Sequence, residues 1–356
     1  MMIVMVAIMA FAVDLGYMCV VRNEAQNAAD AAALAGGQEL ISEQRLRGNF
    51  SDVYYKACDV ASQYTQRHKV GPKYGYLQFW EDVAIGTLND PTNPDAQVVW
   101  NGTSACNAMT VTVRATRERN RESPFFFASV FGLRSFDMEA SATVAFANRI
   151  AGFRSHPAHS TTSLLPLTLK IEDWRDLLAY GCDDQWKYDP RDGSVTPGQD
   201  GIPELNMYPV SSGAGNWGTV DIGTHDNSTS DLVRQIEEGV SRADLDAMGG
   251  AIVLDRYTGL FLVNGDTGIS AGIKSAIGKI VGNPRTIPLY VHCEGTGNTM
   301  NYQIGGFAGI RIVDVSLTGN NKYVRIQPAF VVDPTAVSQS WVQDSYYVVQ
   351  PARLVR

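Results

Sequence analysis

Large apolar residues are concentrated at the start of the chain. Residues 1–21 read MMIVMVAIMAFAVDLGYMCVV, and Asp14 is the only charged side chain among them. As one helix this segment would rise roughly 31 Å, close to the thickness of the hydrocarbon core of a bilayer. It lacks the basic start and the short apolar stretch of a secretory signal peptide. We therefore predict a transmembrane helix, and we expect its natural N-terminus to be processed or to lie further upstream.

Asp14 is the exception within this span. A carboxylate inside a bilayer is costly and is usually retained for a function. The pattern leaves two interpretations open. Asp14 could pair with a partner helix or with the N-terminus of a neighbouring subunit, or it could lie near the far interface and extend to water.

The helical pattern continues beyond the span. Residues 22–46 are rich in Ala, Gln and Glu and contain no proline, which favours a helix. Small residues recur at three- and four-residue spacing, a pattern that allows close approach of another helix. They are Ala25, Ala28, Ala29, Ala32 and Ala35. This alanine seam predicts assembly through the helix, and the alternative is a stalk that packs on the protein's own globular part.

The next segment alternates between helical and strand periodicity. Residues 50–68 repeat apolar positions at helical spacing, whereas residues 109–116 and 138–146 alternate with the period of a half-buried strand. Residues 125–131 are very apolar, and we expect them to be buried. The pattern predicts an α+β module over residues 48–147 that follows a helix over residues 1–47.

The composition changes after this module. Residues 148–163 show no apolar periodicity and are interpreted as a linker. Residues 164–333 carry short apolar runs separated by Gly, Pro and Asn, which predicts a β-rich outer domain. Residues 334–356 form a tail that could add an edge strand. The predicted fold class is therefore α+β, with a long N-terminal helix, an α+β module and a β-rich domain.

Charge and cysteine content narrow the possible partners. The net charge is −8, so a nucleic acid is not expected as a partner, because phosphate binding needs a clustered basic surface. Four cysteines lie far apart in the polar part of the chain, which in an exported protein suggests two disulfides with three possible pairings. They are Cys58, Cys106, Cys182 and Cys293. The alternative is four unpaired buried thiols.

Few residues suggest catalysis or cofactor binding. Asp226, Ser228 and Ser230 match the metal-binding triplet of von Willebrand A-type adhesion domains, but polar residues precede them where a buried strand is expected. Asp266 begins a DTG triplet, and aspartic-protease chemistry needs a second one. We read both segments as turns that lead into helices. The sequence predicts no cofactor and no enzymatic activity.

The N-terminal motifs resemble a known family. Residues 13–17 (VDLGY) and 27–36 (NAADAAALAG) resemble the N-terminal helix of TadG-like proteins of tight-adherence (Tad, Flp-type) pilus systems. The strand, short helix and strand over residues 109–146 are similar to the pilin-like module of that family. The basic residues that usually precede the span are absent here. The resemblance adds Asp14 and Gly16 to the alanine seam as residues of an assembly helix.

The resemblance implies a structural protein of the bacterial cell envelope. We expect a minor pilin or a membrane-anchored pilus-assembly protein with a role in surface attachment. Its partners would be the inner membrane, through residues 1–21, and other pilus components or copies of itself, through the N-terminal helix. The globular part would lie outside the cytoplasm or in an extracellular pilus. The alternatives are the main subunit of an extracellular filament, or a surface adhesin that binds ligands through Trp217, Trp341 and residues 186–210.

Overall fold

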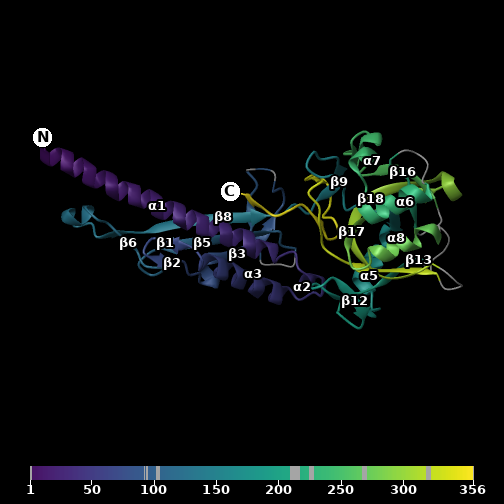
Figure 1. Ribbon diagram of the computed structural model, residues 1–356, viewed down its shortest axis with the longest axis horizontal. Helices are drawn as coiled ribbons and strands as arrows, with labels where there is room; N and C mark the ends of the chain where they lie inside the picture. Colours follow the sequence, from purple (N-terminus) through teal and green to yellow (C-terminus); the bar gives the residue numbers. More distant parts are fainter. Residues whose placement is uncertain are drawn as a thin grey trace. The chain divides into compact units, whose positions relative to one another are not determined.

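The computed structural model describes residues 2–91, 93, 95–101, 105–208, 217–223, 228–266, 271–317 and 322–355. For some helix and strand residues it describes the backbone without the side chain: 2–4, 6, 7, 208, 217, 271 and 298. The chain folds as two compact units (Figure 1). Unit 1 comprises Met1–Phe146 and Ala352–Arg356, and unit 2 comprises Ala147–Pro351.

Unit 1 is a long helix packed on an antiparallel sheet. Its helical segments are α1 Met2–Gln38, α2 Glu43–Leu46, α3 Phe50–Thr65, α4 Phe79–Asp82 and the 3-10 helix η1 Ala128–Phe131. Its strands are β1 Lys69–Val70, β2 Lys73–Tyr74, β3 Val83–Leu88, β4 Val98–Val99, β5 Ala108–Ala115, β6 Ser123–Pro124, β7 Ser135–Phe136, β8 Met138–Ala145 and β23 Arg353–Val355.

The sheet of unit 1 has the order β23-β8-β5-β3-β4, and its central pair follows the predicted alternation. β5 and β8 pair in antiparallel register, with Val111 opposite Ala142 and Val113 opposite Ala140. These apolar residues are buried, whereas Thr110 and Thr112 pair with hydroxyl-bearing residues of β8 on the other face. Because side chains alternate across a strand, one face of this sheet is apolar and packs on α1.

Unit 2 is rich in strands, as predicted. Its helical segments are α5 Ile171–Tyr180, α6 Thr229–Glu238, α7 Arg242–Ala247, η2 Ala271–Ile273, α8 Lys274–Lys279 and η3 Gly297–Thr299. Its strands are β9 Ile150–Arg154, β10 Leu167–Lys170, β11 Trp186–Asp189, β12 Ser194–Pro197, β13 Leu205–Tyr208, β14 Trp217–Val220, β15 Ala251–Val253, β16 Phe261–Asp266, β17 Pro284–Glu294, β18 Met300–Ser316, β19 Tyr323–Pro328, β20 Val331–Val332, β21 Ala336–Ser338 and β22 Val348–Val349.

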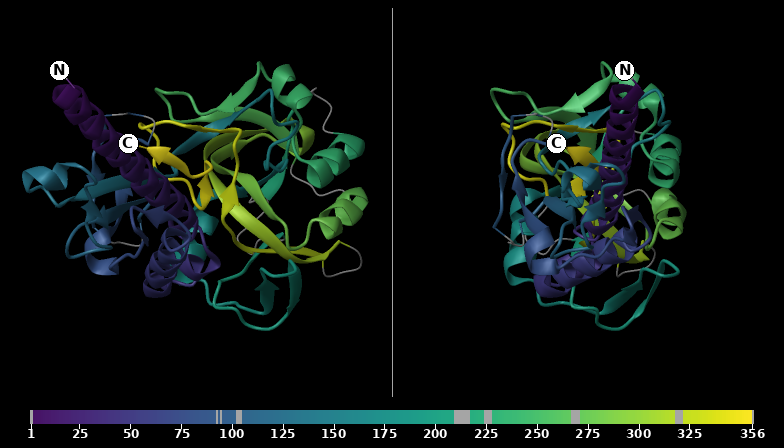
Figure 2. Two further views of the ribbon diagram at one scale, coloured as in Figure 1. Left: turned by 60° about the vertical axis from the view of Figure 1, so that its left-hand side comes forward. Right: turned by 90° about the vertical axis from the view of Figure 1, so that its left-hand side faces the viewer.

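Five of these strands close into a small barrel (Figure 2). The order β18-β16-β14-β10-β17 returns to β18, because β17 pairs with β18 as well as with β10. β10 and β17 run parallel, and the other pairs of the ring are antiparallel. One apolar cluster includes Leu167, Leu169 and Leu289, and a second includes Tyr302 and Phe307. The burial of these side chains stabilises the barrel.

Two boundaries differ from those that the sequence predicts. The expected linker, residues 148–163, contains β9, which lies in the middle of a three-stranded sheet with β15 and β21. Ile150, Ala151 and Phe153 of this strand are buried, so the segment belongs to the core of unit 2. The expected tail, residues 334–356, holds β21, β22 and β23, and β23 pairs with β8 of unit 1. Strands this short have little periodicity in their own sequence, and their pairing with neighbouring strands determines where they form.

Candidate functional site along the N-terminal helix

The C-terminal half of α1 is buried within unit 1. Ala25, Ala28, Ala29 and Ala32 are completely inaccessible, and Ala35 is half-buried. This half of α1 packs against α3, β5 and β8. A side chain at Gly36 would collide with Met109 of β5 and the backbone of α3, and one at Gly37 would collide with Val144 of β8. The small residues of the predicted assembly seam therefore allow close packing inside the chain.

The N-terminal half of α1 presents the opposite surface. Its large apolar side chains are exposed: Met5, Ile8, Met9, Phe11, Val13, Leu15 and Val20. Successive residues of a helix point about 100° apart, so this set covers roughly 200° of the circumference of the helix, and Asp14, Tyr17 and Val21 lie on the remaining side. Gly16 is exposed too, with no atom within 4 Å of the position that a Cβ would take. An apolar surface that covers more than half of a helix is stable only where protein or lipid covers it.

Asp14 is buried within this exposed half. Its carboxylate accepts hydrogen bonds from three consecutive backbone amides, those of Phe126, Phe127 and Ala128. The N–H of Phe126 lies 2.8 Å from Oδ1, and the N–H of Ala128 lies 2.7 Å from Oδ2. Asp14 thus supplies the acceptors that the first turn of η1 lacks. The sequence suggested a neighbouring helix or water as its partner, and the structure places the chain's own backbone there.

The amides come from a hairpin over residues 123–136, which we call the aromatic hairpin. It is formed by β6, η1 and β7, with Ser123 paired to Phe136. Figure 1 shows it extending beside the N-terminal half of α1. Tyr17 of α1 packs edge-on against Phe126 and Phe136, with ring centroids 5.0 Å and 6.0 Å apart. Asp14 and Tyr17 together fix the hairpin on the helix.

The predicted burial of residues 125–131 is wrong for most of the segment. Phe126, Phe127, Val130 and Phe131 are exposed, with Val130 at 82% and Phe131 at 79% of their full surface. The prediction failed because apolar composition alone indicates avoidance of water and does not say what covers the side chains. A signal for this site existed in the sequence, since residues 123–133 form an apolar segment without any charge between Glu122 and Arg134.

The predicted membrane span is only partly covered by the structure. No helix among the described residues is long and apolar enough to cross a membrane. The side chains of residues 1–4, 6 and 7, which form part of the span predicted over residues 1–21, lie outside the described residues.

Two arginines, Arg114 in β5 and Arg119 in the loop after it, form an ion-pair cluster in unit 1. Arg114 and Arg119 both bind the carboxylate of Asp82, whose side chain is fully buried. Arg119 also pairs with Glu81 at 2.6 Å. These acidic partners raise the pKa of Arg119 despite its burial, which alone would lower it. Because both arginines form ion pairs with acidic residues of the same unit, they do not form a basic surface for nucleic acid.

The cysteines form no disulfides. All five lie in the described part of the chain, and neither of the two disulfides suggested by the sequence is present. Cys58 and Cys106 are buried, Cys182 is exposed and Cys293 is half-buried. Burial raises the pKa of the Cys58 thiol to about 11. Because the thiolate is the reactive form, Cys58 is inert at neutral pH.

The candidate metal triplet is only partly described. Asp226 lies outside the described residues, as do Thr267 and Gly268 of the DTG triplet. Ser228 is the N-cap of α6, accepting from the backbone amide of Asp231, and its hydroxyl also bonds that of Ser230. Among the described residues, no three His, Cys, Asp or Glu side chains are grouped as metal ligands. The observed role of Ser228 is helix capping.

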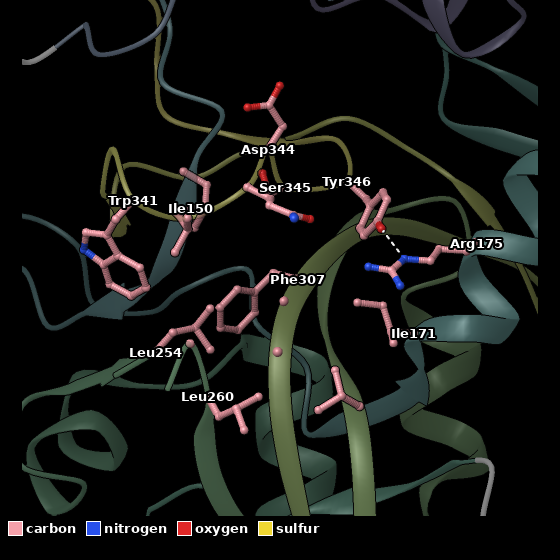
Figure 3. A pocket seen from close by; sticks show the side chains of 16 residues that line it. Ile150, Ile171, Arg175, Leu254, Leu260, Phe307, Trp341, Asp344, Ser345 and Tyr346 are labelled. Atoms are coloured by element: carbon pink, nitrogen blue, oxygen red, sulfur yellow. Dashed lines mark hydrogen bonds between the residues drawn. The ribbon is translucent and has the colours of Figure 1, made fainter. Parts of the chain in front are cut away.

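Unit 2 contains a pocket of about 300 Å³ (Figure 3). Phe307 lies at its centre, with Leu254, Leu260 and Trp341 on one side and Arg175 and Tyr346 on the other. Nε of Arg175 donates to the hydroxyl of Tyr346 at 3.0 Å. Apolar walls with a few convergent polar groups are typical of small-ligand sites. The side chain of Trp217 lies outside the described residues, and residues 186–210 contain strands β11, β12 and β13.

Two protein families match the chain. Residues 1–39 match the family described as "Putative Flp pilus-assembly TadE/G-like", and residues 21–143 match the one described as "Putative Tad-like Flp pilus-assembly". The two matches together cover α1, the sheet up to β8 and the aromatic hairpin. No curated protein and no solved structure matches the chain.

Proposed function

We propose that the protein is a membrane-anchored structural component of a Tad-type pilus system, because residues 1–39 and 21–143 are similar to the Tad-like Flp pilus-assembly family. Proteins of this family are generally non-catalytic. The first half of α1 anchors the protein in the inner membrane, and unit 2 is carried outside the cytoplasm, where it contributes to surface attachment.

The observation that carries this proposal is the exposed apolar surface of α1. Exposing several large apolar side chains of a helix to water would cost about 1.5–3 kcal/mol for each of them. Soluble monomers rarely tolerate so large a contiguous apolar surface. Insertion into a bilayer covers this wide apolar surface at once, whereas a single partner helix would cover only part of it.

The experiment is complementation in cells that lack this protein. We expect the native chain to restore surface pili and to be found in the inner-membrane fraction. The variant with Ile8→Lys and Phe11→Lys should do neither, since a lysine at the centre of a span costs about 2.5–3.5 kcal/mol. Both side chains are exposed, so the substitutions should leave the fold of unit 1 intact.

The matched control carries Ile8→Leu and Phe11→Leu, which keeps the helix apolar, and it should complement fully. Electron microscopy of sheared surface material, with this chain identified by mass spectrometry, completes the test. If the protein is a regular subunit along the filament, it is a filament subunit and not an anchored component. Normal piliation by the lysine variant would refute membrane anchoring through α1.

A second candidate function rests on the pocket of unit 2. We propose that this unit binds a ligand during attachment through the apolar wall formed by Leu254, Leu260 and Trp341. Trp341→Ala should then reduce attachment of piliated cells to a surface without changing piliation. Tyr257→Ala, which removes an exposed aromatic side chain that does not line the pocket, is the control. Equal attachment by both variants would remove the support for this candidate.

A further inference from the structure

The aromatic hairpin is built differently from an ordinary surface turn. Residues 123–133 contain no charged side chain, and five of them expose large apolar groups. These are Phe126, Phe127, Val130, Phe131 and Leu133. Gly132, with a φ of +88°, turns the chain back at the end of η1. An exposed apolar tip of this size marks a surface that contacts protein or lipid.

Several backbone amides of the hairpin donate hydrogen bonds inside the protein. Asp14 accepts from the amides of residues 126, 127 and 128. The amide of Phe125 donates to the carbonyl of Arg134, and that of Leu133 donates to the carbonyl of Ala128. Non-helical backbone is tolerated at membrane depth only where such partners replace water. These three amides also stabilise the Asp14 carboxylate, whose insertion into a bilayer without hydrogen-bond donors would be energetically costly.

We propose that the aromatic hairpin inserts into the lipid bilayer beside the N-terminal half of α1, with Asp14 as the polar junction between the two elements. This inference rests on the membrane anchoring proposed above. It adds a second inserting element to the helix, and it gives Asp14 a role within the chain, which is to make the hairpin compatible with lipid.

The flanking charges favour lipid over a protein partner. Arg121 and Arg134 lie on either side of the uncharged segment and are exposed, whereas Glu122, which directly precedes the segment, is half-buried. Arginines in this position extend to the headgroups and are attracted to anionic lipids. The apolar surface of the hairpin is also continuous with that of α1, because Tyr17 packs directly on Phe126. A partner protein would have to surround both elements.

The depth of the hairpin follows from the helix. Asp14 precedes Val21 by seven residues, which corresponds to roughly 10 Å along the axis. If residues 1–21 cross the bilayer, the tip of the hairpin lies within one leaflet, whose apolar half is about 15 Å thick. The hairpin therefore wedges into the leaflet nearer to unit 1 and does not cross the membrane.

Site-specific photo-crosslinking to lipid tests the proposal. A photoreactive residue replaces Met9, Phe131 or Tyr257 in the full chain, reconstituted in vesicles of phosphatidylethanolamine and phosphatidylglycerol. All three side chains are exposed, so the fold is not disturbed. We expect lipid adducts at positions 9 and 131 and none at position 257, which serves as the exposed aromatic control in unit 2.

The outcomes separate the two proposals. Lipid adducts at position 9 without any at position 131 would overturn the hairpin inference and leave the helix anchor standing. Crosslinks from position 131 to a second copy of the chain, without any to lipid, would also overturn the hairpin inference. Absence of lipid at both positions would refute the anchor as well. Asp14→Ala should reduce the lipid adducts at position 131 while leaving those at position 9 unchanged.

Discussion

The two halves of α1 are parts of one continuous helix, yet they place their side chains in opposite ways. The first half exposes Ile8, Phe11 and other large apolar residues, whereas the second half buries alanines and glycines against the sheet. In soluble proteins the large apolar residues are the ones most often inside. The reversal shows that the fold of unit 1 depends on the small residues, and that the large ones are available for an environment outside the chain.

The largest expected effect comes from enlarging the buried half. Ala32→Leu adds a bulky side chain at a completely buried position where α1 packs on its own unit. We expect unit 1 to lose about 3 kcal/mol of unfolding free energy through overpacking. Ala12→Leu, on the exposed half of the same helix, should change it little. Denaturant unfolding in detergent micelles measures both, and equal effects would contradict the comparison.

A smaller loss is expected from a single methyl group at Gly36. Its Cβ would lie 2.8 Å from the carbonyl oxygen of Ala57 and 2.7 Å from Cε of Met109. Met109 can change rotamer, but the carbonyl belongs to the backbone of α3 and moves only with that helix. We expect Gly36→Ala to destabilise unit 1 by about 1–2 kcal/mol, measured in the same assay. A stabilised variant would mean that α3 is free to move away.

The junction between the exposed half and the hairpin is the third test. Asp14→Ala removes the acceptor of three backbone amides, and loss of such a cap costs about 1–2 kcal/mol. Because the effect is local, it should appear as faster hydrogen exchange at Phe126, Phe127 and Ala128, with little change in α3. Asp14→Asn keeps one carbonyl oxygen and should show an intermediate rate. Unchanged exchange in both variants would show that the hairpin does not depend on Asp14.

Sequence reasoning recovered the parts whose periodicity is strong. The long helix, the paired strands around Val111 and Ala142, and the α+β class follow from local patterns and are confirmed. The parts it missed depend on partners that are distant in sequence. The sequence predicts a linker where β9 lies, because this short strand has no periodicity of its own. It forms by pairing with β15 and β21. Residues 125–131 are exposed, against the prediction, because composition does not reveal the partners of the hairpin, and Asp14 and Tyr17 lie more than a hundred residues away.

The smallest expected effect on stability is at Gly16, and it has the opposite sign to the effect at Gly36. No atom lies within 4 Å of the Cβ that Gly16→Ala would add, and glycine inside a helix costs about 0.5–1 kcal/mol relative to alanine. The isolated protein should therefore be slightly stabilised by a substitution that is harmful at Gly36.

Unfolding in micelles and piliation in cells measure different consequences of this change. If stability rises while piliation is lost, the free face of α1 at Gly16 must approach another helix closely, because an added methyl group interferes only where backbones are in contact. If both are unaffected or improved, lipid alone surrounds this half, and the seam of small residues acts only inside the chain.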